Sequence, residues 1–378
     1  MMVRKYSSVL LAVVFVVAGI VASKAAGDHT PGPVAIAKQG YFYVGGRTVS
    51  GQTVDEMFVQ YQIPAKVTAP YPVVMIHGNF QNGSNFLGTP DDRQGWAEYF
   101  VRRGFAVYVM DQAARGRSIY NPEADGNLAY PNPESIERQF TAIEKYNIWP
   151  QAKMHTQWPG KGVRGDAVFE QFRASQNPSM TDNLKMDAAN RVGGAALLRK
   201  IGPAIVMTHS RSGPFGWEIA DDVPELTKAV IAVEPAGPPF YNVVPTATND
   251  PAAARRYGVA FDHLTFDPPV KDIADFAPKR EDKPQSADLQ ACWVAGAHHK
   301  LPRLMGIPIA IVTAEASYHA AYDHCTSQFL TQAGVVNEFL PLAANGIHGN
   351  GHMMMLEKNN LDIARLIADW IAKHVKKS

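Results

Sequence analysis

Residues 204–213 have the sequence AIVMTHSRSG, and this stretch decides the predicted fold. An apolar run leads directly into Ser210, and residues 217–220 continue as a helix-like segment. A sharp turn from strand to helix that exposes a serine hydroxyl at the edge of a sheet is a nucleophile elbow. The usual pattern is Gly-x-Ser-x-Gly, whereas Thr208 and Ser212 occupy the two glycine positions here. For this stretch taken alone, a serine-rich loop without chemistry is therefore the alternative.

Ser210 is the predicted nucleophile, and it needs a neighbouring base because a serine hydroxyl is a weak nucleophile at neutral pH. Ser212 is the rival, but it follows the turn and is expected to point into the helix. His352 is the predicted base, since it lies in a glycine-rich loop after the last predicted strand and directly before three methionines. His348 lies in the same loop, so spacing alone does not exclude it.

The acid that orients the base has two candidates, Glu234 and Glu315, each at the end of a predicted strand. Its task is to accept a hydrogen bond from the imidazole and to stabilise the imidazolium, and either residue could reach that position. An oxyanion hole needs two backbone N–H groups, one from the residue after the nucleophile and one from an early loop. Arg211 is expected to supply the first, and Asn79, or else Phe80, the second.

Continuous apolar runs separated by amphipathic segments predict the rest of the architecture. Such runs are typical of strands buried on both faces, and strand, helix and strand joined by short links imply a parallel sheet. The order serine, acid, histidine along the chain is that of an α/β-hydrolase, so we expect an α/β fold whose mostly parallel central sheet has helices on both faces. The two earliest strands are expected to be antiparallel. Strands are predicted at 40–44, 57–63, 72–78, 105–111, 204–209, 229–234, 308–314 and 337–342, and helices at 96–103, 186–199, 319–333 and 361–374.

Two stretches interrupt this pattern, near residues 119–182 and 236–304, and we expect them to be insertions that cap the active site. Some of their aromatic side chains could line an apolar pocket for an acyl or alcohol group. For any one of them, a place in the insertion's own small core is the favoured alternative. These residues are Trp149, Trp158, Phe240, Tyr241 and Trp293.

The first 25 residues have the composition of a secretory signal, with cleavage expected after Ala25. An uncleaved membrane anchor is the alternative, but the apolar run at residues 9–22 is shorter than the ~20 residues that span a bilayer. Cleavage would leave residues 26–378 with a net charge of −2, which gives no electrostatic reason to bind nucleic acid or an anionic membrane. The mature protein is therefore expected in the periplasm or outside the cell.

The chain has two cysteines, Cys292 and Cys325. In an oxidising compartment an isolated pair is expected to form one structural disulfide, and two buried free thiols are the alternative. No metal or organic cofactor is expected, because the sequence has neither the Cys/His spacing of zinc sites nor a dinucleotide-binding fingerprint. His298 and His299 are adjacent and would point apart on regular structure.

Several short motifs are spread over most of the mature chain: His-Gly at 77–78, Asp-Gln at 111–112, Arg-Gly-Arg-Ser at 115–118, His-Ser-Arg-Ser-Gly at 209–213, Val-Glu-Pro at 233–235, His-Gly-Asn-Gly-His-Met-Met-Met at 348–355 and Asn-Asn at 359–360. Together they resemble the esterase 713 type of bacterial esterase within the α/β-hydrolase superfamily. The resemblance implies that Glu234 rather than Glu315 is the acid. It also supports Ser210 and His352. The sequence departs from the family at Thr208, where a glycine is expected before His-Ser.

These residues predict a secreted serine hydrolase that cleaves small carboxylic esters through Ser210, His352 and Glu234 and an acyl-enzyme intermediate. A lactonase or an amidase would use the same groups, because one nucleophile and one oxyanion hole serve all acyl transfers. A non-catalytic binding protein of the same fold is the third possibility, and it would have lost a triad member. The resemblance also implies that the protein can form a homodimer.

Overall fold

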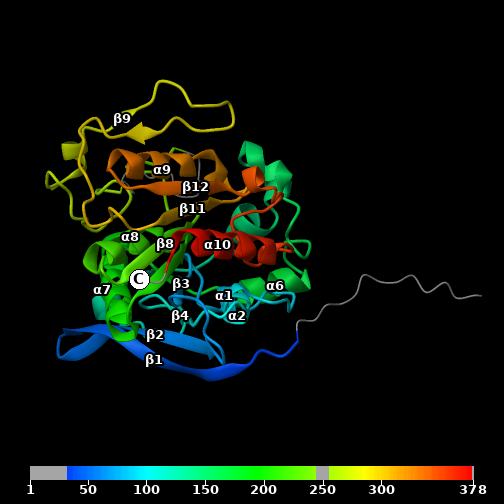
Figure 1. Cartoon of the computed structure of the whole chain (residues 1–378). Helices are drawn as coiled ribbons and strands as arrows, with labels where there is room; N and C mark the ends of the chain where they lie inside the picture. Colours follow the sequence, from blue (N-terminus) through cyan, green and yellow to red (C-terminus); the bar gives the residue numbers. More distant parts are fainter. Residues whose placement is uncertain (1–31, 244–254, 377–378) are drawn as a thin grey trace, which may run out of the picture. The chain divides into compact units, whose positions relative to one another are not determined.

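The computed structural model describes residues 32–243 and 255–376, so the expected signal sequence, residues 1–25, lies outside the described residues. An eight-stranded sheet forms the centre, in the order β1-β2-β4-β3-β7-β8-β11-β12 (Figure 1). From β4 to β12 all neighbours are parallel, whereas β2 pairs antiparallel with both β1 and β4. The predicted α/β fold with a mostly parallel sheet is therefore confirmed. The strands are β1 (Ile36–Val49), β2 (Gln52–Pro64), β3 (Val73–Ile76), β4 (Val107–Met110), β7 (Ala204–His209), β8 (Thr227–Val233), β11 (Ile309–Thr313) and β12 (Asn337–Pro341).

Helices cover both faces of this sheet because successive side chains of a strand point to opposite faces. On β3, Val73 and Met75 pack with α2 and α10, while Val74 and Ile76 pack with α7 and α8. Farther along the sheet, α8 and α9 share a core with β8 and β11. Burial on both faces explains why these strands are continuous apolar runs in the sequence. The helices are α1 (Ser84–Leu87), α2 (Trp96–Arg102), α7 (Asn183–Ile201), α8 (Gly213–Asp222), α9 (Asp323–Gln332) and α10 (Asn360–His374).

The antiparallel hairpin at the edge of the sheet is longer than the sequence pattern predicts. Strands were expected at 40–44 and 57–63. In the structure, β1 pairs with β2 from Lys38 to Gly45 and again from Arg47 to Val49. Glycines 45 and 46 do not end β1, because Gly45 adopts a positive φ of 76° and still pairs with Glu56. Among the described residues, no helix combines the length and the hydropathy needed to cross a membrane.

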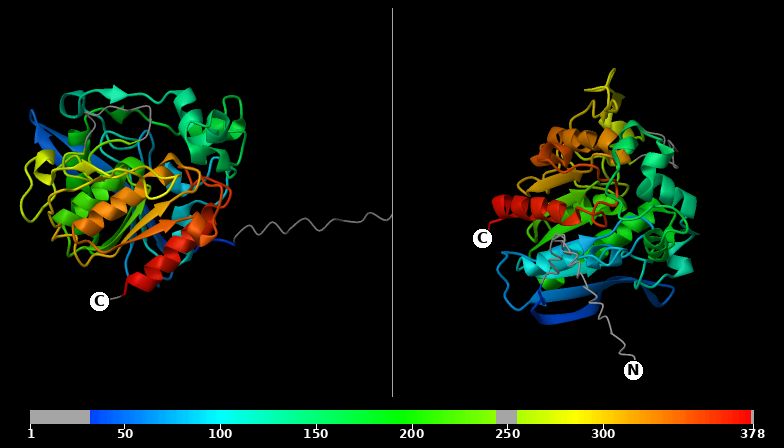
Figure 2. Two further views of the ribbon diagram at one scale, coloured as in Figure 1. Left: turned by 90° about the horizontal axis from the view of Figure 1, so that it is seen from above. Right: turned by 90° about the vertical axis from the view of Figure 1, so that its right-hand side faces the viewer.

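The stretch expected as the first insertion, residues 119–182, folds into short elements, and Figure 2 shows its small helices gathered at one side of the sheet. The second stretch, residues 236–304, is mostly irregular, and its residues 244–254 lie outside the described part. Its Phe240 and Phe276 pack against Phe329 of α9. The elements are α3 (Pro122–Asp125), β5 (Leu128–Ala129), α4 (Pro133–Ile136), the π-helix η1 (Glu137–Thr141), α5 (Ile143–Tyr146), η2 (Pro150–Met154), α6 (Ala167–Ala174) and β6 (Ser179–Met180) in the first stretch, and η5 (Ile273–Phe276), β9 (Lys279–Arg280) and β10 (Trp293–Val294) in the second.

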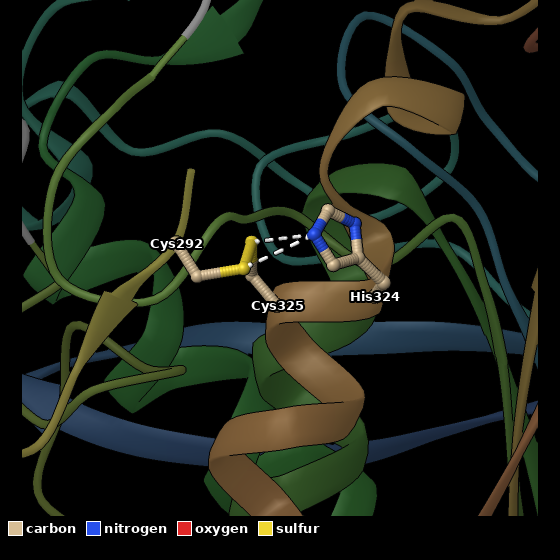
Figure 3. A group of neighbouring side chains, drawn as sticks. All are labelled: Cys292, His324 and Cys325. Carbon is tan, nitrogen blue, oxygen red and sulfur yellow. Dashed lines mark hydrogen bonds between the residues drawn. A yellow bond between two sulfur atoms is a disulfide. The ribbon is translucent and has the colours of Figure 1, made fainter. Parts of the chain in front are cut away.

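A disulfide between Cys292 and Cys325 ties the second stretch to α9 (Figure 3). The sulfurs are 2.02 Å apart and the Cα atoms 5.4 Å apart. The His324 ring lies beside the bond, with Nε2 3.2 Å from Cys292 Sγ and 3.6 Å from Cys325 Sγ. Both cysteines are buried, so this covalent link is part of the core next to α9.

A buried histidine attaches the first stretch to the loop that precedes α10. His155 Nε2 lies 2.7 Å from Glu357 Oε1, and its Nδ1 lies 3.0 Å from Glu144 Oε2. Glu357 also accepts hydrogen bonds from the Gly351 N–H at 3.0 Å and from Asn350 Nδ2 at 2.8 Å. Burial would lower the pKa of His155, but the hydrogen bonds to the two glutamates outweigh it and raise the pKa to about 9. The imidazolium therefore joins this stretch to the segment directly before His352.

Substitution of His155 by Gln is expected to remove a part of the protein's stability that is present at low pH and absent at high pH. The pKa of His155 is raised from 6.5 to about 9 on folding. Protonated His155 thus adds about 3 kcal/mol to the free energy of unfolding. This stabilisation is complete below pH 6.5 and is lost as the pH rises through 9. Urea unfolding between about pH 6 and about pH 10 should show the stability difference between wild type and variant shrinking by that amount. Parallel stability curves would contradict this role, and His263→Gln at the exposed His263 is the control.

Replacement of both cysteines by alanine is expected to lower the free energy of unfolding by about 4 kcal/mol, because the disulfide closes a loop with a sequence separation of 33. Urea unfolding of the double variant measures this loss. His324→Ala, which keeps the disulfide, separates the loss of the cross-link from the loss of packing beside it. A double variant as stable as wild type would show that the bond does not constrain the unfolded chain.

Candidate active site

Ser210 lies in a strained turn between β7 and α8. Its φ is +57°, in the left-handed region that residues other than glycine rarely adopt. The Ser210 carbonyl accepts a hydrogen bond of 2.8 Å from the Ala236 N–H, which follows the end of β8. Ser210 itself is half-buried. Strained non-glycine backbone clusters at functional sites, and the turn holds this serine at the carboxyl edge of the sheet.

The departure from the usual elbow pattern at Thr208 is compensated on the helix. Thr208 is fully buried, and a Cβ at Gly216 of α8 would lie only 3.2 Å from its Cγ2. The small residue that lets strand and helix approach closely therefore stands on the helix instead of the strand. Among the described residues, Thr208 Oγ1 has no hydrogen-bond partner, so the side chain serves packing rather than hydrogen bonding.

Ser212, the rival nucleophile, is fully buried and committed to backbone groups. Its Oγ accepts a hydrogen bond of 2.8 Å from the His209 N–H. It also lies 2.8 Å from the Ile76 carbonyl and 2.9 Å from the His209 carbonyl. These contacts join the ends of β3 and β7, so the Ser212 hydroxyl braces the turn.

The structure brings His352 and Glu234 together. His352 Nδ1–H donates to Glu234 Oε2 over 2.5 Å, and both side chains are buried. Glu234 follows β8 and has a positive φ of 44°. Its other hydrogen bonds come from the Ala314 N–H at 2.8 Å and the Ser317 hydroxyl at 2.7 Å. Because Nδ1 is committed to the carboxylate, Nε2 is the ring atom left to exchange a proton.

Burial determines the pKa of both groups. Desolvation lowers the pKa of His352 well below its ordinary value, and the nearby His209 and His319 lower it further. Desolvation raises the pKa of Glu234, as does the neighbouring Asp323, while the hydrogen bonds from Ser317 and Ala314 oppose the rise. A neutral imidazole is the form that can accept a proton, so this environment suits a general base.

The two alternatives left open by the sequence, His348 and Glu315, pair with each other. His348 Nδ1 lies 3.1 Å from Glu315 Oε1, and Glu315 Oε2 accepts a hydrogen bond of 2.9 Å from the Gly349 N–H. The His348 side chain is 61% exposed. A cavity of about 520 Å³ beside His348 has neither Ser210, His352 nor Glu234 in its lining. The pair therefore stabilises the loop before His352 at the surface.

Four rings surround the His352 imidazole, and the sequence analysis predicted this position for none of them. The ring of Phe140 from η1 stacks on it at a centroid distance of 5.4 Å. His319 stacks at 4.9 Å, Tyr318 lies at 4.9 Å and His209 at 4.6 Å. Both Tyr318 and His319 belong to η6 (Tyr318–Ala321), just after β11. Their place after a parallel strand, at the edge that carries Ser210, was the available signal.

The loop expected to complete the oxyanion hole lies against the nucleophile turn. A Cβ at Gly78 would lie 2.9 Å from Ser210 Cβ and 2.9 Å from His209 Nδ1, so glycine is needed for this approach. Asn79 follows, and its Oδ1 accepts a hydrogen bond from the Ser179 hydroxyl. On the other side, the Arg211 guanidinium bonds Asp187 Oδ1 at 2.5 Å. Asn79 thus follows the glycine that approaches Ser210, Arg211 follows Ser210 itself, and both side chains are engaged elsewhere.

The aromatic residues that could line a pocket lie in different parts of the protein. Trp158 and Phe240 belong to hydrophobic cores, and Tyr241 and Trp293 pack on each other at 4.7 Å. Trp149 meets Tyr318, a ring next to His352, edge to face at 5.7 Å. For most of these residues the structure thus shows packing within the protein.

Two groups of side chains among the described residues bring possible metal-ligand atoms within 4.8 Å of one another. In the first, Cys292 and Cys325 with His324, both sulfurs are in the disulfide and offer no thiolate. The second consists of Glu234, His319 and His352, where the carboxylate and the His352 ring already bond each other. Each group includes residues far apart in the sequence, which is why spacing rules did not find them.

Comparison with known proteins shows the family of this chain. No protein-family model matches it. A fungal protein described as "Probable secreted lipase phiG" (Fungal sp., strain ATCC 74256) is 41% identical over 334 residues, which cover 88% of this chain and 89% of the relative. The solved structure described as "The Atomic Resolution Structure of a Novel Bacterial Esterase" has a TM-score of 0.61 and 24% identity, covering 92% of this chain and 98% of that one, and it supports the fold. The chain therefore belongs to the same family of carboxylic ester hydrolases as this relative, and it has the α/β-hydrolase fold.

Proposed function

We propose that the protein is an exported serine esterase with Ser210 as nucleophile, His352 as base and Glu234 as acid. The observation that carries the proposal is the buried hydrogen bond of 2.5 Å between His352 Nδ1 and Glu234 Oε2. It fixes the tautomer in which Nε2 accepts a proton. The left-handed turn at Ser210, φ +57°, supports the same assignment, as does the engagement of the rival Ser212 with backbone groups.

The reaction follows from these roles. Ser210 Oγ attacks the ester carbonyl carbon while its proton moves to His352 Nε2, and Glu234 stabilises the imidazolium. The N–H groups of Asn79 and Arg211 donate to the oxyanion that forms. Collapse breaks the bond to the alcohol, which takes the proton from Nε2, and an acyl-enzyme is left. Water repeats these steps, and the carboxylic acid is released.

The substrate in this proposal is a carboxylic ester with an apolar acyl chain. The faces of Phe140 and Tyr318 beside His352 are apolar, which favours such a chain over a charged group. The 41% identical relative carries the description of a secreted lipase, which supports both the ester class and export from the cell. A p-nitrophenyl ester series of increasing acyl length measures the preferred chain.

Ser210→Ala is expected to lower kcat by about 10³-fold or more, because the nucleophile is lost while the fold is kept. Hydrolysis of the p-nitrophenyl series by the mature protein measures the effect, and a fluorophosphonate should label wild type but not the variant. Ser212→Ala is the matched control, and it should still be labelled. Labelling that survives in Ser210→Ala, or wild type that neither turns over nor becomes labelled, would refute the proposal.

Glu234→Gln is expected to lower kcat by about 10²- to 10⁴-fold, because an amide cannot hold the imidazole in the required tautomer. The variant keeps the size of the side chain, and its melting temperature checks the fold. Glu315→Gln changes the surface pair with His348 and should leave kcat close to wild type. If Glu315→Gln were the more damaging substitution, the acid would be assigned wrongly.

A further inference from the structure

Tyr318 contacts the atom that would carry the proton, His352 Nε2. Its Oη is 3.3 Å from His352 Nε2, and among the described residues this is the hydrogen bond that Nε2 makes. The Tyr318 ring also lies 4.9 Å from the imidazole, centroid to centroid, at an angle of 41°. Tyr318 as a whole is half-buried.

The surroundings of Tyr318 hold it in this place from two sides. The neighbouring Ser317 hydroxyl donates to Glu234 Oε2 at 2.7 Å, which ties the start of η6 to the acid. From the first stretch of short helices, Trp149 Nε1 donates to the Ala316 carbonyl at 2.8 Å. The Trp149 ring then meets the Tyr318 ring at 5.7 Å with an interplanar angle of 72°. A phenol held this way is preorganised, which costs no ordering at the moment of reaction.

The protonation state of Tyr318 is constant over the working pH range. Burial raises the pKa of Tyr318 above its usual value, and Glu234 and Asp323 raise it further, whereas its hydrogen bond with Ser210 opposes the rise. The phenol therefore keeps its proton and can donate it in a hydrogen bond while its oxygen accepts another. His352 Nε2 has one lone pair, because Nδ1 is committed to Glu234, and the Tyr318 hydroxyl faces it in this structure.

We propose that Tyr318 is a catalytic residue that holds the hydrolytic water at His352 Nε2 and stabilises Ser210 Oγ as it leaves during deacylation. The inference rests on the proposed function. In the acyl-enzyme Ser210 has no hydroxyl proton, so water takes the position within ~3 Å of Nε2. Tyr318 Oη, 3.3 Å from Nε2, accepts a hydrogen bond from the second hydrogen of that water. Its own O–H donates to Ser210 Oγ.

Deacylation breaks one bond to the acyl carbon for the one that it forms. The water oxygen bonds the acyl carbon while one water proton moves to His352 Nε2. The bond between the acyl carbon and Ser210 Oγ then breaks, Nε2 returns its proton to Oγ, and the acid leaves. Tyr318 keeps its proton throughout. A hydrogen bond donated to Oγ helps this atom to leave but weakens it as the attacking group, so Tyr318 should favour deacylation over acylation.

Tyr318→Phe tests the proposal, because it removes the hydroxyl and keeps the ring. Stopped-flow hydrolysis of p-nitrophenyl butyrate separates the p-nitrophenol burst, which measures acylation, from the steady state that follows. We expect deacylation to slow by about tenfold, the effect of one lost hydrogen bond to a charged group, with acylation changed much less. The variant should therefore accumulate acyl-enzyme and show a larger burst. A fluorophosphonate should label its Ser210 at the wild-type rate.

Tyr322→Phe is the matched control, since Tyr322 is a buried tyrosine whose ring lies 6.4 Å from that of Tyr318. It should leave the ratio of deacylation to acylation at the wild-type value. If both steps slow equally in Tyr318→Phe, or if neither slows, the role in deacylation is wrong. A failure of the proposed function would look different, because wild type itself would then show neither labelling at Ser210 nor a burst.

Discussion

The hydrogen bond between His352 and Glu234 is the interaction around which the rest of the site is built. It joins residues 118 positions apart in the chain, and burying two ionisable groups is costly unless they are paired. The protein meets this cost with further bonds to the carboxylate from Ala314 and Ser317. Glu357 accepts the Gly351 N–H directly before His352 and so fixes the loop that carries the imidazole. The parallel strands bring all these groups to one edge.

Much of this arrangement could be predicted because parallel strands end at a shared edge of the sheet. A polar residue that directly follows an apolar run is therefore expected at that edge. Ser210 and Glu234 were predicted in this way, and His352 by its place after the last strand, and the structure pairs His352 with Glu234. The choice between Glu234 and Glu315 could not be made from spacing, because it depends on the conformation of the loop before His352. The packing of Thr208 against Gly216 could not be predicted from the Gly-x-Ser-x-Gly motif, because Gly216 lies on the helix, outside that motif.

The rings around the imidazole show the limit of sequence reasoning more clearly. Phe140 comes from a π-helix in an irregular stretch, whereas Tyr318 and His319 come from the turn after β11. Periodicity predicts which face of a helix or strand is buried, but these contacts join short elements with no repeating pattern. Their positions follow from tertiary packing, including the attachment of the first stretch through His155 and Trp149. An imidazole enclosed by rings in this way has few rotamers open to it.

The disulfide closes a covalent ring that contains β11 and the whole of η6, because these elements lie between Cys292 and Cys325. A protease that cut one peptide bond inside this ring would leave the two fragments joined through sulfur. Ser317 and Tyr318 would stay tethered near the His352 imidazole, and the strand that supports them could not diffuse away. The disulfide thus lets the segment that contains Tyr318 tolerate a single cut without separating from the rest of the protein.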